Sequence, residues 1–180
     1  MGSLGSNQGP SGGWSLKGKV ALITGAGRGL GAGLAEILAE RGANVVINYA
    51  NSAKAAMAVV DRIEKAGGKA VAVQANVSKT PEVTRLFEQA VAHFGRLDIV
   101  INNSGMEAFS AEEDVTEELY DQVFGLNTRA QFFVGQHALK HLSRKSPPVE
   151  RPAALVPADG PAQVAAALFS CRRSRPKCPA

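Results

Sequence analysis

Residues 24–31 read Thr24-Gly25-Ala26-Gly27-Arg28-Gly29-Leu30-Gly31, and this glycine-rich stretch decides the fold. A strand-like apolar run precedes it, and a segment with helical spacing of apolar residues follows it. In such an arrangement Gly25 permits a tight turn, Gly29 lets the backbone approach a pyrophosphate, and Gly31 allows close helix packing. The N-terminus of the helix adds free N–H groups for an anion. The alternative is an ordinary glycine-rich turn. The residues expected to bind a dinucleotide here are Gly25, Arg28, Gly29, Leu30 and Gly31.

On both sides of this turn, short apolar runs alternate with longer stretches of helical period. This alternation is typical of an α/β protein with a parallel sheet. The sequence predicts strands at 20–24, 44–49, 70–74 and 97–102, and helices at 29–41, 53–66, 81–94 and 117–142. Thr80 and Thr116 are the expected N-caps of the last two helices.

Two of these helices carry apolar positions that we expect to face the core. In the first helix they are Leu30, Leu34, Ile37 and Leu38. In the last helix they are Leu119, Val123, Leu126, Phe133, Val134 and Leu142.

Composition changes at both ends of this regular region. Residues 1–15 are rich in Gly and Ser, and we expect them to form a disordered leader. Residues 143–180 hold seven of the nine prolines and 7 Lys/Arg against 2 Asp/Glu, so the net charge of +4 belongs to this tail. The tail is expected to be mostly disordered, with a single candidate helix at 162–169. The sequence thus predicts one domain, residues 16–142.

Several classes of function are disfavoured. No apolar run approaches the roughly 20 residues of a membrane span, so a cytoplasmic protein is expected. Cys171 and Cys178 lack the partners of a zinc site, and His137 and His141 lack a third ligand, so we predict surface histidines and no metal. The basic cluster at 172–177 is interpreted as solvated charge, and nucleic-acid binding as unlikely.

A second motif follows the fourth predicted strand: Asn102-Asn103-Ser104-Gly105. Together with Thr-Gly-x-x-x-Gly-x-Gly, it resembles the short-chain dehydrogenase/reductase family over residues 16–142. Residues 48–52 and 127–134 are similar to polyhydroxynaphthalene and versicolorin reductases. The resemblance implies a Rossmann-like, doubly wound parallel sheet, of which this chain has the N-terminal half with strand order 3-2-1-4. The C-terminal half of the family pattern is missing, as a frame change, a retained intron or an alternative splice end would produce.

The choice of cofactor is argued from the end of the second predicted strand. An NAD enzyme places Asp or Glu there to bind the ribose 2′-hydroxyl, whereas this chain has Tyr49-Ala50-Asn51-Ser52. Without a carboxylate, a 2′-phosphate can be bound by Arg28, Asn51 and Ser52. NADP is therefore the expected cofactor. The alternative is that Asn51 and Ser52 only cap the next helix.

Two further segments are assigned from the resemblance. Asn76-Val77 stands where the family has Asp-Val, at the adenine amino group, and the carbonyl of Asn76 could still accept that hydrogen bond. Asn103, Ser104 and Gly105 are expected on the ribose side of the cofactor, with a purely structural turn as the alternative.

Catalytic residues are largely absent from the sequence. Asn127 matches the family's helix Asn, which helps to hold a proton-relay water, although it could instead bond nearby backbone. The family's Ser and Tyr-x-x-x-Lys have no match, since both tyrosines, Tyr49 and Tyr120, precede Asn127. The resemblance implies an NADP-dependent reductase of an aromatic ketone or naphthol, and this chain is expected to be inactive. The alternative is a non-catalytic nucleotide-binding or interaction fragment that joins full-length relatives through an exposed sheet edge.

Overall fold

The structure is a computed structural model that describes residues 15–142. Four parallel strands form one sheet in the order β3-β2-β1-β4. The strands are β1 (Val20–Ile23), β2 (Asn44–Tyr49), β3 (Lys69–Gln74) and β4 (Ile99–Ile101). The helices are α1 (Gly29–Glu40), α2 (Ala53–Lys65), α3 (Thr80–Phe94), the short 3₁₀ helix η1 (Glu112–Asp114), α4 (Glu117–Phe124), the π-helical η2 (Gly125–Ala130) and α5 (Gln131–His141). The predicted fold class and strand order are confirmed.

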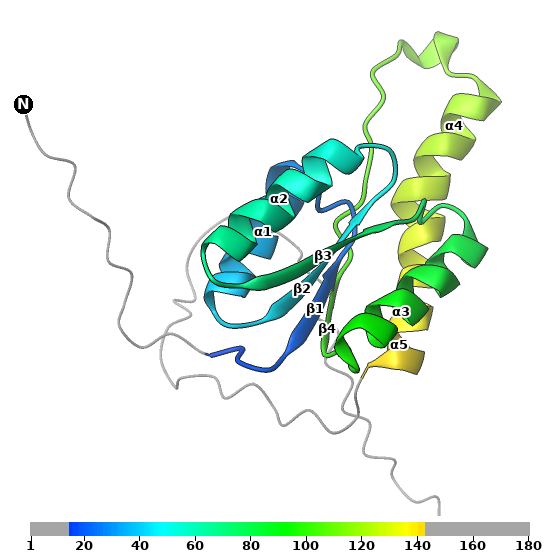
Figure 1. Ribbon diagram of the computed structural model, residues 1–180. Helices are drawn as coiled ribbons and strands as arrows, with labels where there is room; N and C mark the ends of the chain where they lie inside the picture. Colours follow the sequence, from blue (N-terminus) through cyan, green and yellow to red (C-terminus); the bar gives the residue numbers. More distant parts are fainter. Residues whose placement is uncertain (1–14, 143–180) are drawn as a thin grey trace, which may run out of the picture.

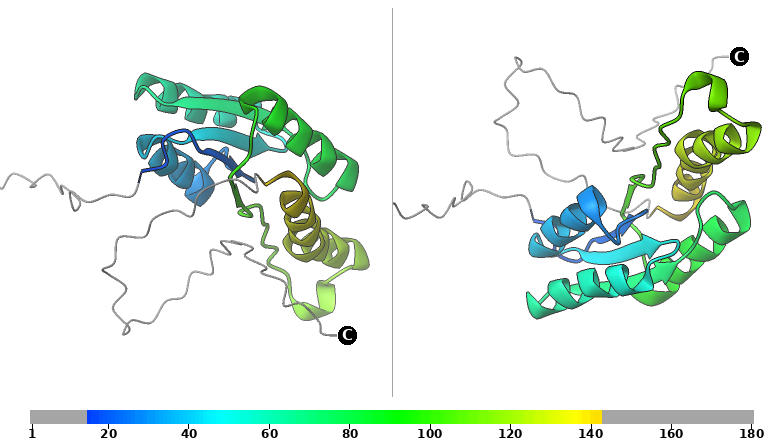
Figure 2. Two further views of the ribbon diagram at one scale, coloured as in Figure 1. Left: turned by 90° about the horizontal axis from the view of Figure 1, so that it is seen from below. Right: turned by 90° about the horizontal axis from the view of Figure 1, so that it is seen from above.

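The sheet separates two cores because side chains alternate along each strand. Ala21 and Ile23 of β1 pack under α1 and α2, whereas Val20 and Leu22 pack under α3 and α5. Figures 1 and 2 show this layering, with α1 and α2 on one face of the sheet and α3 and α5 on the other. All four residues of β1 are buried, as expected of a strand covered on both faces.

The predicted boundaries of the strands and helices agree with the structure to within two residues, and the differences lie in caps and helix winding. The N-cap of α3 is Lys79 rather than Thr80, and it makes no side-chain cap bond. Thr116 does cap α4, since its hydroxyl accepts a hydrogen bond from the N–H of Leu119 at 3.2 Å. The last predicted helix is continuous in space, but six of its residues, Gly125–Ala130, are wound as a π-helix.

The prediction for the buried face of α1 was wrong in part. Leu38 is buried, but Leu30 is 66% exposed and Ile37 is 50% exposed. Small residues form the buried face instead, because the backbone of α1 packs closely on the sheet and on the turn before it. The buried residues of α1 are Gly31, Ala32, Ala35, Leu38 and Ala39.

The last predicted helix also buries fewer apolar residues than expected. Val134 is buried, Leu126 and Leu142 are partly buried against the same core, and α4 buries no residue. His137, predicted to lie on the surface, is only 7% exposed, and its ring lies 5.7 Å from the ring of Phe87 in α3. The prediction missed this burial because helix α3 packs against that side of α5.

Some expectations lie outside the described residues. These are the leader, apart from Ser15, and the tail 143–180 with its candidate helix, its basic cluster and both cysteines. Between residues 15 and 142, no helix is long and apolar enough to cross a membrane. The same residues contain no group of three or more His, Cys, Asp or Glu arranged to hold a metal ion.

Candidate functional site

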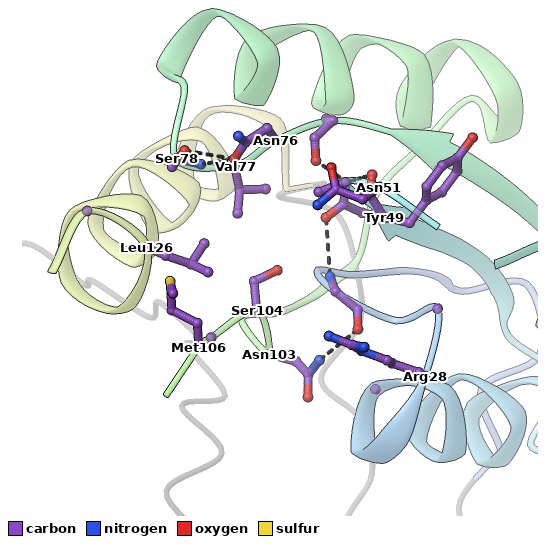
Figure 3. Close-up of a pocket in the computed structure, with 18 of the residues that line it drawn as sticks. Arg28, Tyr49, Asn51, Asn76, Val77, Ser78, Asn103, Ser104, Met106 and Leu126 are labelled. Carbon is purple, nitrogen blue, oxygen red and sulfur yellow. Dashed lines mark hydrogen bonds between the residues drawn. The ribbon is translucent and has the colours of Figure 1, made fainter. Parts of the chain in front are cut away.

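A cleft of about 1410 Å³ lies at the carboxyl ends of the four strands. The chain passes from β1 outward to β2 and β3 and then returns to place β4 on the other side of β1. In open parallel sheets, ligands bind at this reversal of strand order. Figure 3 shows residues from the ends of all four strands, together with Leu126 of η2, around this cleft.

The glycine turn forms one wall of the cleft, and its geometry requires glycine at two positions. Gly25 has φ +63° and Gly29 has φ +57°, a region that side chains disfavour. A Cβ on Gly29 would meet nothing within 4 Å, so the backbone there is open to a ligand. A Cβ on Gly31 would lie 2.5 Å from Nδ2 of Asn103 and 2.9 Å from Cα of Ala26. Gly31 therefore lets α1 pack closely against the glycine turn itself and against the turn after β4, and not only against the strands.

The N-terminus of α1 points into this cleft without a capping side chain. Arg28 is the N-cap residue, with an extended backbone and no side-chain cap bond, and the first turn holds no acidic residue. The first N–H groups of an α-helix have no acceptor within the helix. Gly29, Leu30 and Gly31 therefore offer N–H groups and the positive end of the helix dipole to an anion.

Thr24 ties the glycine turn to the turn after β4. Its buried hydroxyl accepts hydrogen bonds from the N–H groups of Asn103 and Ser104, both at 3.0 Å, and donates to the carbonyl of Ile101 at 3.4 Å. Nδ2 of Asn103 donates to the carbonyls of Thr24 at 2.8 Å and Gly25 at 3.3 Å. Much of the bonding capacity of Asn103 is thus structural, which supports the alternative weighed for this motif.

The segment after β2 forms another wall. Tyr49 is half-buried, and Ala50, Asn51 and Ser52 are exposed beside the cleft. Ser52 precedes α2 as its N-cap residue, yet its side chain makes no cap bond. Its hydroxyl is therefore available to a ligand, and the simple capping interpretation loses its support. Arg28, also exposed, lines the same cleft.

The turn after β3 is held by hydrogen bonds within the turn. Oδ1 of Asn76 accepts from the N–H of Ser78 at 3.1 Å and from its hydroxyl at 2.7 Å, so both lone pairs of this oxygen are engaged. These bonds give the side chain of Asn76 a structural role in the turn, and its contact with an adenine amino group stays a prediction. The N–H of Asn76 donates to Glu82 at 2.7 Å, and this bond holds the pKa of the Glu82 carboxyl below its usual value, with help from Lys79 and Arg85. Val77 is buried beside the turn.

Asn127 lies in the π-helical η2, where its side-chain amide pairs with the backbone of Met106. Its Oδ1 accepts from the N–H of Met106 at 2.9 Å, and its Nδ2 donates to the carbonyl of Met106 at 2.8 Å. This is the backbone-bonding alternative weighed for Asn127. A Cβ on Gly105 would come within 3.4 Å of Oδ1 of Asn127, so the two motifs are adjacent.

The sequence interpretation missed two residues that line the cleft, Asn48 and Arg129, and one beside it, Gln131. Gln131 donates to the carbonyl of Ser104 at 2.5 Å, Arg129 donates to the carbonyl of Ser78 at 3.1 Å, and Asn48 bonds the glycine turn from the end of β2. Their partners are distant in the sequence, so no local pattern reveals them. For Asn48 there was one signal: a polar residue that directly follows the apolar run at 45–47.

A second hollow, of about 660 Å³, continues from the cleft on the β4 side. It is lined by Arg28, by residues 103–107, by Asn127 and by Gln131. The arrangement as a whole consists of a helix terminus without a side-chain cap, a segment without carboxylate after β2, and a polar hollow beside β4.

Comparison with known proteins agrees with this geometry. The chain is 62% identical over 128 residues to the hydroxynaphthalene reductase-like protein Arp2 of Metarhizium majus, which covers 71% of this chain and 48% of that protein. It is 59% identical over 128 residues to elsinochrome reductase 1 of Elsinoe fawcettii, with the same coverage of 71% and 48%. The chain therefore spans about half the length of these curated relatives.

Solved structures that superimpose on this chain are also similar to it in sequence. A dehydrogenase/reductase from Sinorhizobium meliloti superimposes with a TM-score of 0.70 at 40% identity, over 71% of this chain and 51% of that one. A short chain dehydrogenase from Burkholderia cenocepacia in complex with NADP gives 0.68 at 40% identity, over 71% and 52%. The family model for short chain dehydrogenases matches residues 19–148. The chain thus belongs to the short chain dehydrogenase family.

Proposed function

We propose that residues 16–142 form the NADP(H)-binding domain of a reductase for hydroxylated aromatic ketones or naphthols. The observation that carries this proposal is the uncapped N-terminus of α1, which opens into a cleft where strand order reverses. Two relatives of the chain are named as reductases of hydroxynaphthalene or elsinochrome type, and one structural neighbour was solved with NADP. These names support the substrate class and the cofactor.

The described residues fit this cofactor. The N–H groups of Gly29 to Gly31 would bind the pyrophosphate, and the open space at Gly29 leaves room for it. Arg28, Asn51 and Ser52 would bind the 2′-phosphate, since no carboxylate stands between Tyr49 and Ser52 to repel it. The base would lie toward Asn76 and Val77, and the other ribose toward residues 103–105.

We further propose that this polypeptide does not reduce a carbonyl by itself. When bound, NADPH supplies a hydride, and the resulting alkoxide must receive a proton. Asn127 cannot deliver it, because an amide has no titratable proton and both of its polar atoms bond Met106. Its role is to position the segment after β4. The 180 residues contain no Tyr-x-x-x-Lys that could act in its place.

A second candidate function is association with another polypeptide. Strand β4 forms an edge of the sheet among the described residues, and all three of its residues are only half-buried. Asn102, directly after β4, donates to the carbonyl of Gln131 in α5, and the next residue of that helix, Phe132, is 67% exposed. Exposed edges and apolar patches of this kind favour association with further chains, including full-length relatives.

The cofactor assignment is tested by titrating the purified chain with NADP and with NAD in a calorimeter. We expect tighter binding of NADP, and we expect Ala50→Asp to reverse this preference by placing a carboxylate beside Ser52. Equal affinity for the two nucleotides in the parent chain would contradict the assignment. NADPH oxidation that depends on a naphthol, quinone or ketone and is abolished by Gly29→Asp would overturn the proposed lack of activity.

A further inference from the structure

Asn48 is a buried amide near the end of strand β2, directly after the buried apolar residues 45–47. It lies in β2, whose sequence is NVVINY, and its side chain is 1% exposed. A polar group is buried at this depth only when its hydrogen bonds are satisfied. The partners of Asn48 therefore show what the residue is for.

The amide of Asn48 connects the ends of three strands. Its Oδ1 accepts a hydrogen bond from the N–H of Gly25, in the turn after β1, at 3.2 Å. Its Nδ2 donates to the carbonyls of Ala75 at 2.9 Å and Val73 at 3.3 Å, at the end of β3. Its own backbone carbonyl accepts from the N–H of Ala26 at 2.9 Å.

This set of partners requires an amide. One planar group must present an acceptor to Gly25 and two donors to two carbonyls, which is what Asn provides. Aspartate would place oxygen against the carbonyls of Val73 and Ala75, and an apolar side chain would leave the N–H of Gly25 without an acceptor. Side-chain volume alone therefore does not explain the residue.

The contacts have two consequences for a bound nucleotide. The N–H groups of Gly25 and Ala26 donate to Asn48, so the groups that the turn can present to an anion come later, from Gly27 to the start of α1. The same side chain holds Ala75, which directly precedes Asn76 and Val77 in the opposite wall of the cleft. Asn48 thus fixes the separation of the two walls.

We propose that Asn48 is a positioning residue that holds the phosphate-binding turn and the base-side segment at the spacing a dinucleotide requires. This inference rests on the proposed function, because it takes NADP(H) as the ligand that spans both walls. A ligand that engages two subsites gains affinity only when the geometry permits both contacts at once. A ligand that contacts only one wall gains no affinity from the spacing between the two walls.

The test compares NADP with inorganic pyrophosphate, which would bind only at the glycine turn and the start of α1, in calorimetric titrations of the full chain. We expect Asn48→Asp to weaken NADP binding by about tenfold or more, and pyrophosphate binding by less than about threefold. Asn48→Ser, which keeps one donor and one acceptor, should give an intermediate ratio. It also carries the test if Asn48→Asp does not fold.

A control separates positioning from simple destabilisation. Val59→Ala opens a space in α2 at a buried site that does not line the cleft, and it should leave the ratio of the two affinities unchanged. If the Asn48 variants lose both ligands in equal proportion, the positioning role is overturned while the proposed function stands. If the parent chain binds neither ligand, the proposed function itself fails.

Discussion

The chain before Met106 and the chain from Met106 to Leu142 differ in how they bury apolar residues. In the first region, both faces of β1 and β2 are covered by helices, and large side chains such as Phe87 and Leu22 are fully buried. In the second region, α4 buries no residue, and Phe109 is 94% exposed. The first region is a packed unit that shapes most of the cleft. The second region adds one wall to the cleft, and no described residue covers the outer surface of that wall.

The largest effect is expected where the first region is tightest. Gly31→Val would place side-chain atoms against Asn103 and Ala26, costing about 1–3 kcal/mol of stability. The displaced turn should weaken NADPH binding on the order of 100-fold, as measured by fluorescence titration. Gly33→Ala, in the same helix but facing open space, is the matched control and should stabilise by up to about 1 kcal/mol. A similar loss of stability and of NADPH binding in both variants would contradict the packing argument.

Removing one hydroxyl from each region should have unequal effects. Thr24→Val leaves the N–H groups of Asn103 and Ser104, which are half-buried, without their acceptor, and this should cost about 1–3 kcal/mol. Thr116→Val removes an exposed helix cap and should cost about 1 kcal/mol or less. Urea denaturation of the two variants measures the difference. A larger loss from Thr116→Val would reverse the comparison drawn between the regions.

The exposed apolar surface of the second region should drive association. We expect the parent chain to self-associate, and Phe132→Glu to weaken the association by about tenfold, because it places charge on that surface. Met57→Glu, at a half-exposed position on α2, is the matched substitution in the first region and should have little effect. Light scattering over a range of concentrations distinguishes the variants. A parent chain that stays monomeric at high concentration would contradict this account.

A smaller, pH-dependent effect is expected where α5 packs on α3. Burial lowers the pKa of His137, with further contributions from Lys140 and His141 and an opposing one from Glu88. The unfolded chain therefore binds this proton more readily than the folded one, so the stability from neutral His137 is present above about pH 6.5 and is lost below it. The melting temperature of the parent should fall more on acidification than that of His137→Leu. If the melting temperatures of the two proteins fall in parallel as the pH is lowered, His137 does not contribute to this pH dependence.

The sequence was sufficient for features that depend on local patterns. The glycine turn, the capping Thr116 and the strand order followed from turn chemistry, apolar periodicity and the family resemblance. The buried face of α1 was mispredicted because the sequence interpretation gave more weight to the large apolar residues Leu30 and Ile37 than to the small residues. In the structure, α1 packs closely on the sheet and buries the small residues. The bonds of Asn48 and Thr24 join segments 23 to 80 residues apart, which no local pattern encodes.

The central claim is that the N-terminus of α1 binds the phosphates of a nicotinamide nucleotide. Gly29→Asp tests it most directly, because the aspartate would bring its own carboxylate to the N–H groups meant for the ligand. NADPH fluorescence should saturate with the parent chain and with Gly33→Asp, whose side chain faces open space. With Gly29→Asp, binding should fall on the order of 100-fold. NADPH binding to Gly29→Asp as tight as to the parent would contradict the account.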